Sequence, residues 1–218
     1  MNGRVVRVAL IHALAHSVAP VNDEMAGSWP ACRRMNLLDD SLSADLAAAG
    51  RIDAAMTGRF LALANYAVGT GAQALLFTCS AFGPCIDAVA RRHAGLPVLK
   101  PNQAMIDEAV ALGGRIGLVA SFAPTLAAMP AEFPPGVELR TRLAEGALEA
   151  LGHGDAAGHD ARVAAAAEAL VRDEGCRVVA LAQFSMARAR DAVAARTGVP
   201  VLTTVASAVR RLRERLGG

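Results

Sequence analysis

The sequence has few aromatic residues, no excess of charge of one sign and no long apolar run. Of its 218 residues 4% are aromatic, with one Trp and one Tyr, and 22 Lys and Arg stand against 20 Asp and Glu. Because the basic residues are scattered, they form no stripe that could follow a nucleic acid backbone, and few rings are present to stack on bases. No apolar run approaches the length of about 18 residues that a membrane-spanning helix needs. We therefore expect neither a nucleic acid nor a membrane partner.

Cysteine is also scarce. The chain has four, which form neither a dense disulfide framework nor a CxxC pair: Cys32, Cys79, Cys85 and Cys176. Such a pattern predicts reduced thiols and a cytoplasmic protein. Because a reduced thiol can react, one of the four cysteines could take part in catalysis.

What the sequence does contain is an alternation of short β-rich runs with longer helical patterns. With 54% apolar residues the chain can bury a core, and disorder is excluded. The alternation is typical of α/β folds with parallel sheets. Strands are predicted at residues 4–14, 35–39, 74–78, 97–99, 115–120, 137–141, 177–182 and 200–202. The clearest helix covers residues 160–173, because its apolar residues recur at helical spacing and Gly175 ends the run.

The two halves of the chain repeat each other. Three segments return in the same order, 108, 104 and 103 positions later: Arg7–Ile11 at Arg115–Val119, Asp87–Ala90 at Asp191–Ala194, and Gly95–Leu99 at Gly198–Leu202. A period of about 100 residues is too long for a solenoid and indicates two copies of one lobe. The alternative is a single doubly wound sheet whose βα units are alike only because all such units are.

We therefore predict two pseudo-symmetric α/β lobes, each a parallel sheet flanked by helices. Lobe 1 comprises residues 1–103 plus 205–218, with the last helix, residues 206–216, returning to it, and lobe 2 comprises residues 104–204. No linker rich in Ser, Gly or Pro separates the lobes, which suggests that they share a cleft.

Ligands of parallel α/β sheets bind beyond the carboxyl ends of the strands. Only Cys79 directly follows a predicted strand and precedes a helix. The helix dipole and unpaired backbone N–H groups are expected to lower the pKa of such a thiol and make it an acid, base or nucleophile. Thr78, Ser80 and the N–H groups around Ala81 would offer donors to an anion. The alternative is that Cys79 is a small buried hydrophobe.

Residues 77–89, Phe-Thr-Cys-Ser-Ala-Phe-Gly-Pro-Cys-Ile-Asp-Ala-Val, are echoed by Leu-Ala-Gln-Phe-Ser-Met at residues 181–186. This pattern resembles the aspartate/glutamate racemase superfamily, closest to its hydantoin racemase and arylmalonate decarboxylase branches, and through the repeat it covers essentially the whole chain. The resemblance implies a site in the cleft between two lobes and catalysis by cysteine without cofactor or metal. It also implies a small carboxylate or amino-acid-like substrate. Members typically carry one cysteine per lobe, on opposite faces of the substrate's α-carbon. A homo-oligomer is left open.

The chain departs from that pattern in its second half. A shift of 104 positions from Cys79 leads to Gln183, and a glutamine cannot exchange a proton as a thiol does. The other polar residues near the strand ends of lobe 2, Ser121, Thr125 and Ser185, do not titrate near neutral pH either. Single-thiol chemistry therefore fits better than two-base racemisation. In the decarboxylase branch, loss of carbon dioxide leaves an enediolate that one cysteine protonates on one face.

Racemisation, isomerisation and decarboxylation all remain open, as does a non-catalytic carboxylate-binding protein. His12 could be a second acid or base or a structural histidine, Asp40 a ligand or a helix cap, and Ser17 a carboxylate ligand or a helix start. Lys100 and Asn102 could line the cleft. The substrate-binding assignment comprises Thr78, Ser80, Ala81, His12, Ser17, Asp40, Asn102, Ser121, Thr125, Gln183 and Ser185.

Two histidines and two aspartates in the second half of the chain lie close together in the sequence. His153 and His159, with Asp155 and Asp160, have a spacing that suggests metal ligands. They lie in a Gly- and Ala-rich region without a companion cysteine, so no metal site is expected.

Overall fold

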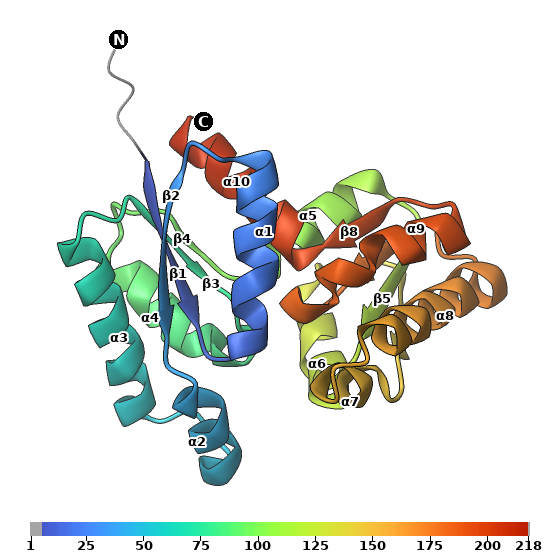
Figure 1. Cartoon of the computed structure of the whole chain (residues 1–218), viewed down its shortest axis with the longest axis horizontal. Coiled ribbons are helices and arrows are strands. Elements are labelled where there is room, and N and C mark those ends of the chain that lie inside the picture. The colour runs from blue at the N-terminus through green and yellow to red at the C-terminus, as the bar shows by residue number, and fades with distance from the viewer. Residues whose placement is uncertain (1–5, 218) are drawn as a thin grey trace. The chain divides into compact units, whose positions relative to one another are not determined.

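The strands of the chain form two separate parallel sheets and not one doubly wound sheet (Figure 1). In the computed structural model, which describes residues 6–217, contacts divide the chain into two compact units. Unit 1 is Met1–Pro101 with Ala208–Gly218, and unit 2 is Asn102–Ser207. The second boundary falls within α10 (Thr204–Leu216).

Unit 1 is a four-stranded sheet in the order β2-β1-β3-β4, with every neighbouring pair parallel. Its elements before α10 are β1 (Arg7–His12), η1 (Ala15–Ser17), α1 (Val18–Ser28), β2 (Arg33–Leu38), α2 (Ser41–Ala49), α3 (Ala54–Gly69), β3 (Ala74–Phe77), η2 (Ser80–Phe82), α4 (Gly83–Arg92) and β4 (Val98–Leu99), where η denotes a 3-10 helix.

Unit 2 repeats this topology with the order β6-β5-β7-β8, again wholly parallel. Its elements are α5 (Gln103–Leu112), β5 (Ile116–Ala120), α6 (Ala123–Ala128), η3 (Met129–Glu132), β6 (Leu139–Leu143), α7 (Ala147–Gly152), α8 (Ala156–Glu174), β7 (Val178–Leu181), η4 (Phe184–Ala189), α9 (Arg190–Thr197) and β8 (Val201–Thr203). The three repeated sequence segments lie in β1 and β5, in α4 and α9, and around β4 and β8, so they occupy equivalent places in the two units.

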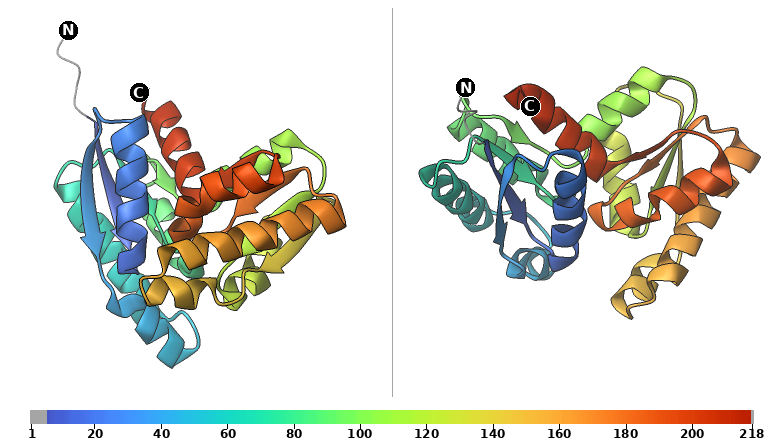
Figure 2. Two further views of the ribbon diagram at one scale, coloured as in Figure 1. Left: turned by 45° about the vertical axis from the view of Figure 1, so that its right-hand side comes forward. Right: turned by 45° about the horizontal axis from the view of Figure 1, so that its top comes forward.

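Burial explains the strand order. Of the inner strands, β3, β5 and β7 are buried along their whole length and β1 is buried from its second residue onward, as continuous apolar runs are when helices cover both faces of a parallel sheet. The outer strand β2 carries Arg33 and Arg34 and is partly exposed. In Figures 1 and 2, α1 lies on one face of the first sheet and α3 and α4 lie on the other.

Successive side chains of a strand point to opposite faces of the sheet, so the first sheet has a core layer on each face. Ala9 and Ile11 of β1 pack with Leu75 and Phe77 of β3 against α3 and α4. Phe60 of α3 stacks on Phe77, with ring centroids 5.5 Å apart. The intervening buried residues of β1 point to the opposite face of the sheet.

All eight predicted strands are present, with bounds that differ by a few residues. Residues 4 and 5 of the first predicted strand lie outside the described residues. The strand predicted at residues 137–141 is β6, which begins two residues later because its first partner is Ile116, paired with Leu139. The helix predicted at residues 160–173 is α8, and Gly175 ends it in the left-handed conformation with φ 65°.

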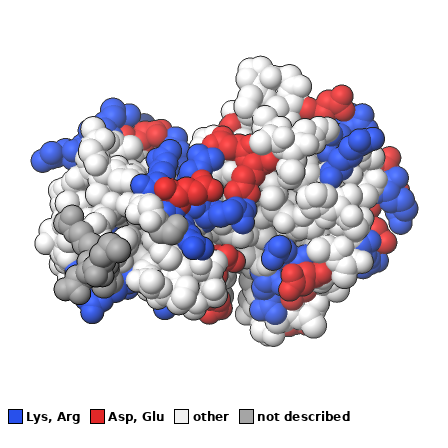
Figure 3. All heavy atoms as spheres, turned by 90° about the horizontal axis from the view of Figure 1, so that it is seen from above, with Lys and Arg blue, Asp and Glu red and all other residues white. Residues whose placement is uncertain are grey.

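The surface carries acidic and basic side chains close to one another, as the balanced composition predicts (Figure 3). Within residues 6–217, no helix combines the length and the apolar character required to cross a bilayer.

The glycine that ends α9 provides a test of the backbone geometry. Gly198 has φ 67°, Gly58 lies inside α3, and a Cβ at either position would meet no atom within 4 Å. Gly198→Ala should therefore lower the free energy of unfolding by about 1–2 kcal/mol through backbone strain alone. Gly58→Ala should raise it by about 0.5–1 kcal/mol, because alanine favours the helix interior. Urea denaturation measures both, and changes of the same sign would contradict the assigned conformations.

Candidate active site

The carboxyl ends of β1, β2 and β3 bring several polar residues of unit 1 to one edge of its sheet. His12 is the last residue of β1, and Thr78 and Cys79 follow β3. The parallel ladder continues past the strands, since the Thr78 N–H donates to the Ile11 carbonyl oxygen and the Asp39 N–H donates to that of His12, each at 3.1 Å. This pairing holds the loop before Cys79 beside the end of β1.

Cys79 lies where the chain changes from strand to helix. It has extended backbone angles, φ −125° and ψ 118°, and immediately precedes η2, which runs into α4. Its side chain is half-buried, whereas Cys32, Cys85 and Cys176 are buried. Cys79 is therefore the one cysteine residue of the four that is not buried.

The environment of Cys79 raises the pKa of its thiol. Burial disfavours the thiolate and outweighs the Ala81 backbone N–H and the Ser43 hydroxyl, which hydrogen-bond to the sulfur and lower the pKa. The expected lowering of the pKa is thus wrong in direction, because a partly desolvated thiolate loses more from water than it gains from two donors and a short helical turn. At neutral pH the side chain is a thiol.

Ser43 was not predicted as a site residue. It lies on α2, half-buried, and its hydroxyl donates to the Ala13 carbonyl oxygen at 3.1 Å. The same hydroxyl lowers the pKa of Cys79 when it turns its single proton to the sulfur instead. The available signal was its position on the helix that follows β2, at the carboxyl edge of the sheet.

His12 is fully buried, and both its ring nitrogens have partners. Nδ1 lies 3.0 Å from Thr78 Oγ1, and Nε2 lies 3.0 Å from Asn36 Oδ1. Burial lowers the pKa of His12, and the Asn36 hydrogen bond raises it less. In this conformation both ring nitrogens are occupied by partners within unit 1. The substrate-binding assignment of His12 stays a prediction, with a structural histidine as its alternative.

The other predicted residues of unit 1 have varied surroundings. Ser80 is half-buried at the start of η2 and Ala81 is exposed. Ser17 is 6% exposed at the junction of η1 and α1. Asp40 is exposed and precedes α2, but its side chain makes no capping hydrogen bond.

An ion-paired cluster lies next to Asp40. Asp39 accepts hydrogen bonds from the Ser41 hydroxyl at 2.7 Å and from Arg59 Nε at 3.1 Å, and Arg59 also pairs with Asp45. Although burial alone would raise it, these hydrogen bonds and the charge of Arg59 hold the pKa of Asp39 below its ordinary value. The cluster ties α2, which carries Ser43, to α3.

Lys100 and Asn102 both have partners within their own units. Lys100 Nζ lies 2.8 Å from a carboxylate oxygen of Asp87 on α4. Asn102 is 1% exposed at the start of α5 in unit 2, and its amide donates to Glu132 at 3.2 Å.

Gln183 occupies in unit 2 the place that Cys79 has in unit 1. Each is the second residue after an inner strand and the residue before a 3-10 helix, with extended backbone angles. The registers also correspond, because Ile11 pairs with Phe77 in unit 1 and Val119 pairs with Leu181 in unit 2. The repeat thus preserves the backbone position and replaces the thiol by an amide.

The Gln183 side chain is held by Ser121. The Ser121 N–H and hydroxyl donate to Gln183 Oε1 at 2.7 and 3.0 Å. Because a backbone N–H can only donate, the oxygen must face Ser121 and the NH₂ group must point elsewhere. Within residues 6–217 no hydrogen bond from Gln183 Nε2 is found, so that group is a donor available to a ligand.

Two further predicted residues also belong to unit 2. Thr125 is half-buried on α6, and Ser185 is half-buried in η4.

The histidine cluster of unit 2 lies at α8. His159 is buried in this helix, with Nδ1 2.8 Å from Asp160. In the described part of the chain, no three His, Cys, Asp or Glu side chains are arranged to hold a metal ion.

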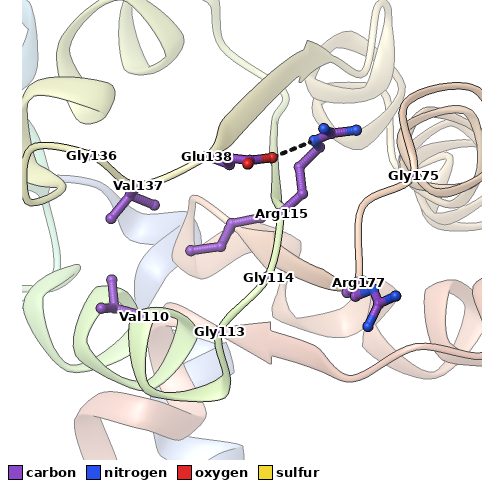
Figure 4. A pocket seen from close by; sticks show the side chains of 10 residues that line it. Val110, Gly113, Gly114, Arg115, Gly136, Val137, Glu138, Gly175 and Arg177 are labelled. Carbon is purple, nitrogen blue, oxygen red and sulfur yellow. Dashed lines mark hydrogen bonds and ion pairs between the residues drawn. The ribbon is translucent and has the colours of Figure 1, made fainter.

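A pocket of about 560 Å³ lies at the opposite edge of the second sheet, by the amino ends of β5, β6 and β7 (Figure 4). Figure 4 shows Arg115 turned toward Glu138, with which it pairs at 3.0 Å. Arg115 Nη1 also donates to the carbonyl oxygen of Glu174, the last residue of α8. Because helix C-termini favour cations, we interpret the arginine here as neutralising a helix end, away from Gln183.

Comparison with protein families gives one match that spans most of the chain. The model of the Asp/Glu/Hydantoin racemase family matches residues 35–212, a range that contains Cys79 and Gln183. A comparison with curated proteins found no match.

Solved structures with the same fold cover nearly the whole chain. An aspartate racemase homologue from Pyrococcus horikoshii OT3 has a TM-score of 0.75 at 15% identity, covering 97% of this chain and 99% of that one. Allantoin racemase from Klebsiella pneumoniae has a TM-score of 0.73 at 15% identity, covering 97% and 88%. A glycine-to-cysteine variant of arylmalonate decarboxylase has a TM-score of 0.67 at 20% identity, covering 97% and 94%. At these identities the likeness establishes the fold.

The raised pKa of Cys79 can be measured by alkylation. Iodoacetamide should modify Cys79 before the three buried cysteines, because access decides the order. Its rate should follow a titration with a midpoint above about 8.5, the ordinary cysteine value. Peptide mass mapping over time between pH 6.5 and 10 provides the measurement, with the denatured protein as the control. A midpoint below that of the denatured chain would contradict the effect of burial.

Proposed function

Because the chain belongs to the Asp/Glu/Hydantoin racemase family, we propose that it catalyses proton transfer at a carbon next to a carboxylate or similar carbonyl, with Cys79 as the acid/base and without a cofactor. The observation that carries this proposal is the half-buried thiol at the carboxyl edge of the first sheet, between two donors. Membership of the family supports the class of reaction, and the location of Cys79 supports its assignment as the reacting group.

The protonation state of Cys79 favours its use as a proton donor. The thiol proton is transferred to the carbanionic carbon of an enediolate: the S–H bond breaks, and the enediolate electron pair forms the new C–H bond. The resulting thiolate is stabilised where it forms by the Ala81 N–H and, once it turns from the Ala13 carbonyl oxygen, by the Ser43 hydroxyl. Water then returns the proton to sulfur. In the exchange direction the thiolate removes the same proton.

Substrate carboxylate oxygens require donors, and we propose that the Ser80 hydroxyl and the N–H groups of η2 supply them in unit 1. Within unit 2, we propose the NH₂ group of Gln183, with Ser121, Thr125 and Ser185, as ligands for polar groups of a substrate. Ser17, Asp40 and Asn102 remain proposed substrate ligands. The Thr78 hydroxyl instead contacts His12 Nδ1 at 3.0 Å.

Decarboxylation of a malonate-type acid is the second candidate reaction, and Gln183 favours it. Two-base racemisation needs a second group that can return a proton on the far face, and an amide cannot do so. Loss of carbon dioxide instead breaks a C–C bond and generates the enediolate without a base. A single protonated thiol then completes the reaction.

The proposal predicts a specific pattern of deuterium incorporation. Wild-type protein in D₂O should place deuterium at the α-carbon of a small carboxylic acid, detected by mass spectrometry. Cys79→Ser should lower this rate by about 10² or more, because a hydroxyl is a far weaker acid than a thiol. Gln183→Cys should create or raise racemisation by adding a second thiol. Cys32→Ser is the matched control, since Cys32 precedes β2 at the opposite edge of the sheet and should leave the rate unchanged.

Two outcomes would overturn the proposal. Exchange that is unaffected by Cys79→Ser would remove Cys79 from the reaction. Binding of carboxylates without exchange in the wild type and in both site variants would instead establish the non-catalytic carboxylate-binding protein. Circular dichroism melting curves verify that each variant is folded.

The pH dependence should differ between the two directions. Because the protonation step uses the thiol, decarboxylation should keep its rate to about pH 8.5 and fall only as the pH rises through the raised pKa of Cys79. Exchange by proton abstraction uses the thiolate and should rise over the same interval. Initial rates between pH 6.5 and 10.5 measure both. A decarboxylation rate that already halves by pH 7.5 would contradict a protonated resting thiol.

A further inference from the structure

A chain of polar side chains leads from α1 to the residue before Cys79. Asn22 on α1 and Asn36 on β2 exchange hydrogen bonds through their amides at 2.9 and 3.2 Å. Asn36 Oδ1 also contacts His12 Nε2, and His12 Nδ1 contacts Thr78 Oγ1, each at 3.0 Å. His12 and Thr78 are 0% and 5% exposed. The network thus passes through the interior and ends one residue from the thiol.

The direction of every hydrogen bond in this network follows from one carbonyl group. Asn22 Nδ2 lies 2.7 Å from the Val18 carbonyl oxygen, which can only accept, so the orientation of the Asn22 amide is determined. Asn36 Nδ2 must then donate to Asn22 Oδ1, which leaves Asn36 Oδ1 facing His12.

His12 is therefore protonated on Nε2, because Asn36 Oδ1 is an acceptor. With a neutral ring, Nδ1 carries a lone pair, and the Thr78 hydroxyl donates its proton to it. The Ile11 carbonyl oxygen is a weaker alternative at 3.5 Å. The Thr78 N–H is also engaged, with Ile11. In this arrangement the Thr78 hydroxyl directs its proton to His12 and not to a substrate anion.

We propose that His12 is a positioning residue that acts through Thr78 on Cys79. By accepting the Thr78 hydroxyl proton, His12 holds the side chain of the residue to which Cys79 is joined, and so holds the peptide from which the thiol projects. This inference rests on the proposed function of Cys79. A purely structural histidine would only stabilise the fold. A positioning residue predicts in addition that protonation of the His12 ring changes the environment and activity of Cys79.

Protonation of the ring would reverse the last hydrogen bond. With a proton on Nδ1 as well, His12 becomes a donor there, and the Thr78 hydroxyl must turn its own proton away. Burial, which lowers the pKa of His12, places this reversal below pH 6.5. The charged and titratable groups on the elements packed around His12 are Arg7 on β1, Asp23 and Glu24 on α1, Arg33 and Arg34 on β2, Asp39 beyond β2, Arg59 on α3 and Cys79 beyond β3.

Asn36→Asp tests the transmission. The carboxylate can still accept from Nε2–H and from Asn22 Nδ2 and stabilises the imidazolium, but it replaces the 3.2 Å bond to Asn22 Oδ1 by a contact between two acceptors. Thermal melting measures the stability that this contact costs. It should raise the pKa of His12 and move the acid limb of the kcat profile to higher pH by about 1 unit or more. His93 gives the matched control, because its Nε2 lies 3.1 Å from Asn65 Oδ1 at the exposed surface of the same unit. Asn65→Asp should leave the acid limb in place.

Nuclear magnetic resonance reports on the network independently of turnover. The ¹⁵N shifts of the His12 ring should show the Nε2–H form at neutral pH. The backbone amide signal of Cys79 should titrate with the same midpoint as the ring, in the wild type and, at higher pH, in Asn36→Asp. His12→Gln should remove this titration and lower kcat by about 10-fold with KM changed less than 2-fold, while thermal melting measures any loss of stability separately.

The outcomes separate the two proposals. An Nδ1–H ring, a Cys79 amide that ignores the ring titration, or an acid limb that stays in place when Asn36→Asp raises the pKa of His12 would each overturn the role of His12, even in an active protein. A wild-type protein that exchanges no α-proton would overturn the proposed function, and with it the positioning of Cys79 for catalysis.

Discussion

Parallel pairing of the strands is the constraint on which the other features depend. Since every strand in a sheet runs the same way, all the loops that follow strands gather at one edge, and helices begin there. Cys79 and His12 come from residues far apart in the sequence and meet for this reason alone. The same pairing gathers helix C-termini at the other edge, where Arg115 neutralises one of them.

Partial burial determines what the thiol can do. A cysteine at a helix start in contact with water would ionise readily, and its strength would be as a base or nucleophile. Burial keeps Cys79 protonated, and in the proposed reaction the Ala81 N–H would stabilise the thiolate that forms when the proton leaves. Burial thus favours the protonated resting state, and the donors offset part of the free-energy cost of the thiolate when the proton is transferred.

The internal repeat shows how one backbone supports two chemistries. Cys79 and Gln183 have the same place in the same topology, yet one ends in a titratable sulfur and the other in an amide whose oxygen is bound by Ser121. The fold therefore imposes a position and leaves the side chain to decide the reaction. Solved structures with this fold include racemases and a decarboxylase, which is consistent with that freedom.

The sequence by itself determined the elements and the position of the candidate site. Apolar runs interrupted by helical patterns predict buried parallel strands, and a cysteine directly after such a run must lie at the carboxyl edge. The positions of strands and helices, and of a residue relative to a strand end, are local properties that the spacing of residues along the chain can indicate. The strand ends were less accurate, because a strand ends where its neighbour stops pairing.

Only the tertiary structure decided the electrostatics of the site. The direction of the pKa shift at Cys79 depends on how much of the sulfur is covered by residues distant in the sequence, and spacing does not report coverage. Spacing also could not identify Ser43 as a neighbour of Cys79 or Asn36 as a partner of His12, because each of these residues lies on another strand or helix. Charge, proton direction and accessibility are properties of neighbours in space, which the order of residues along the chain specifies only through the fold.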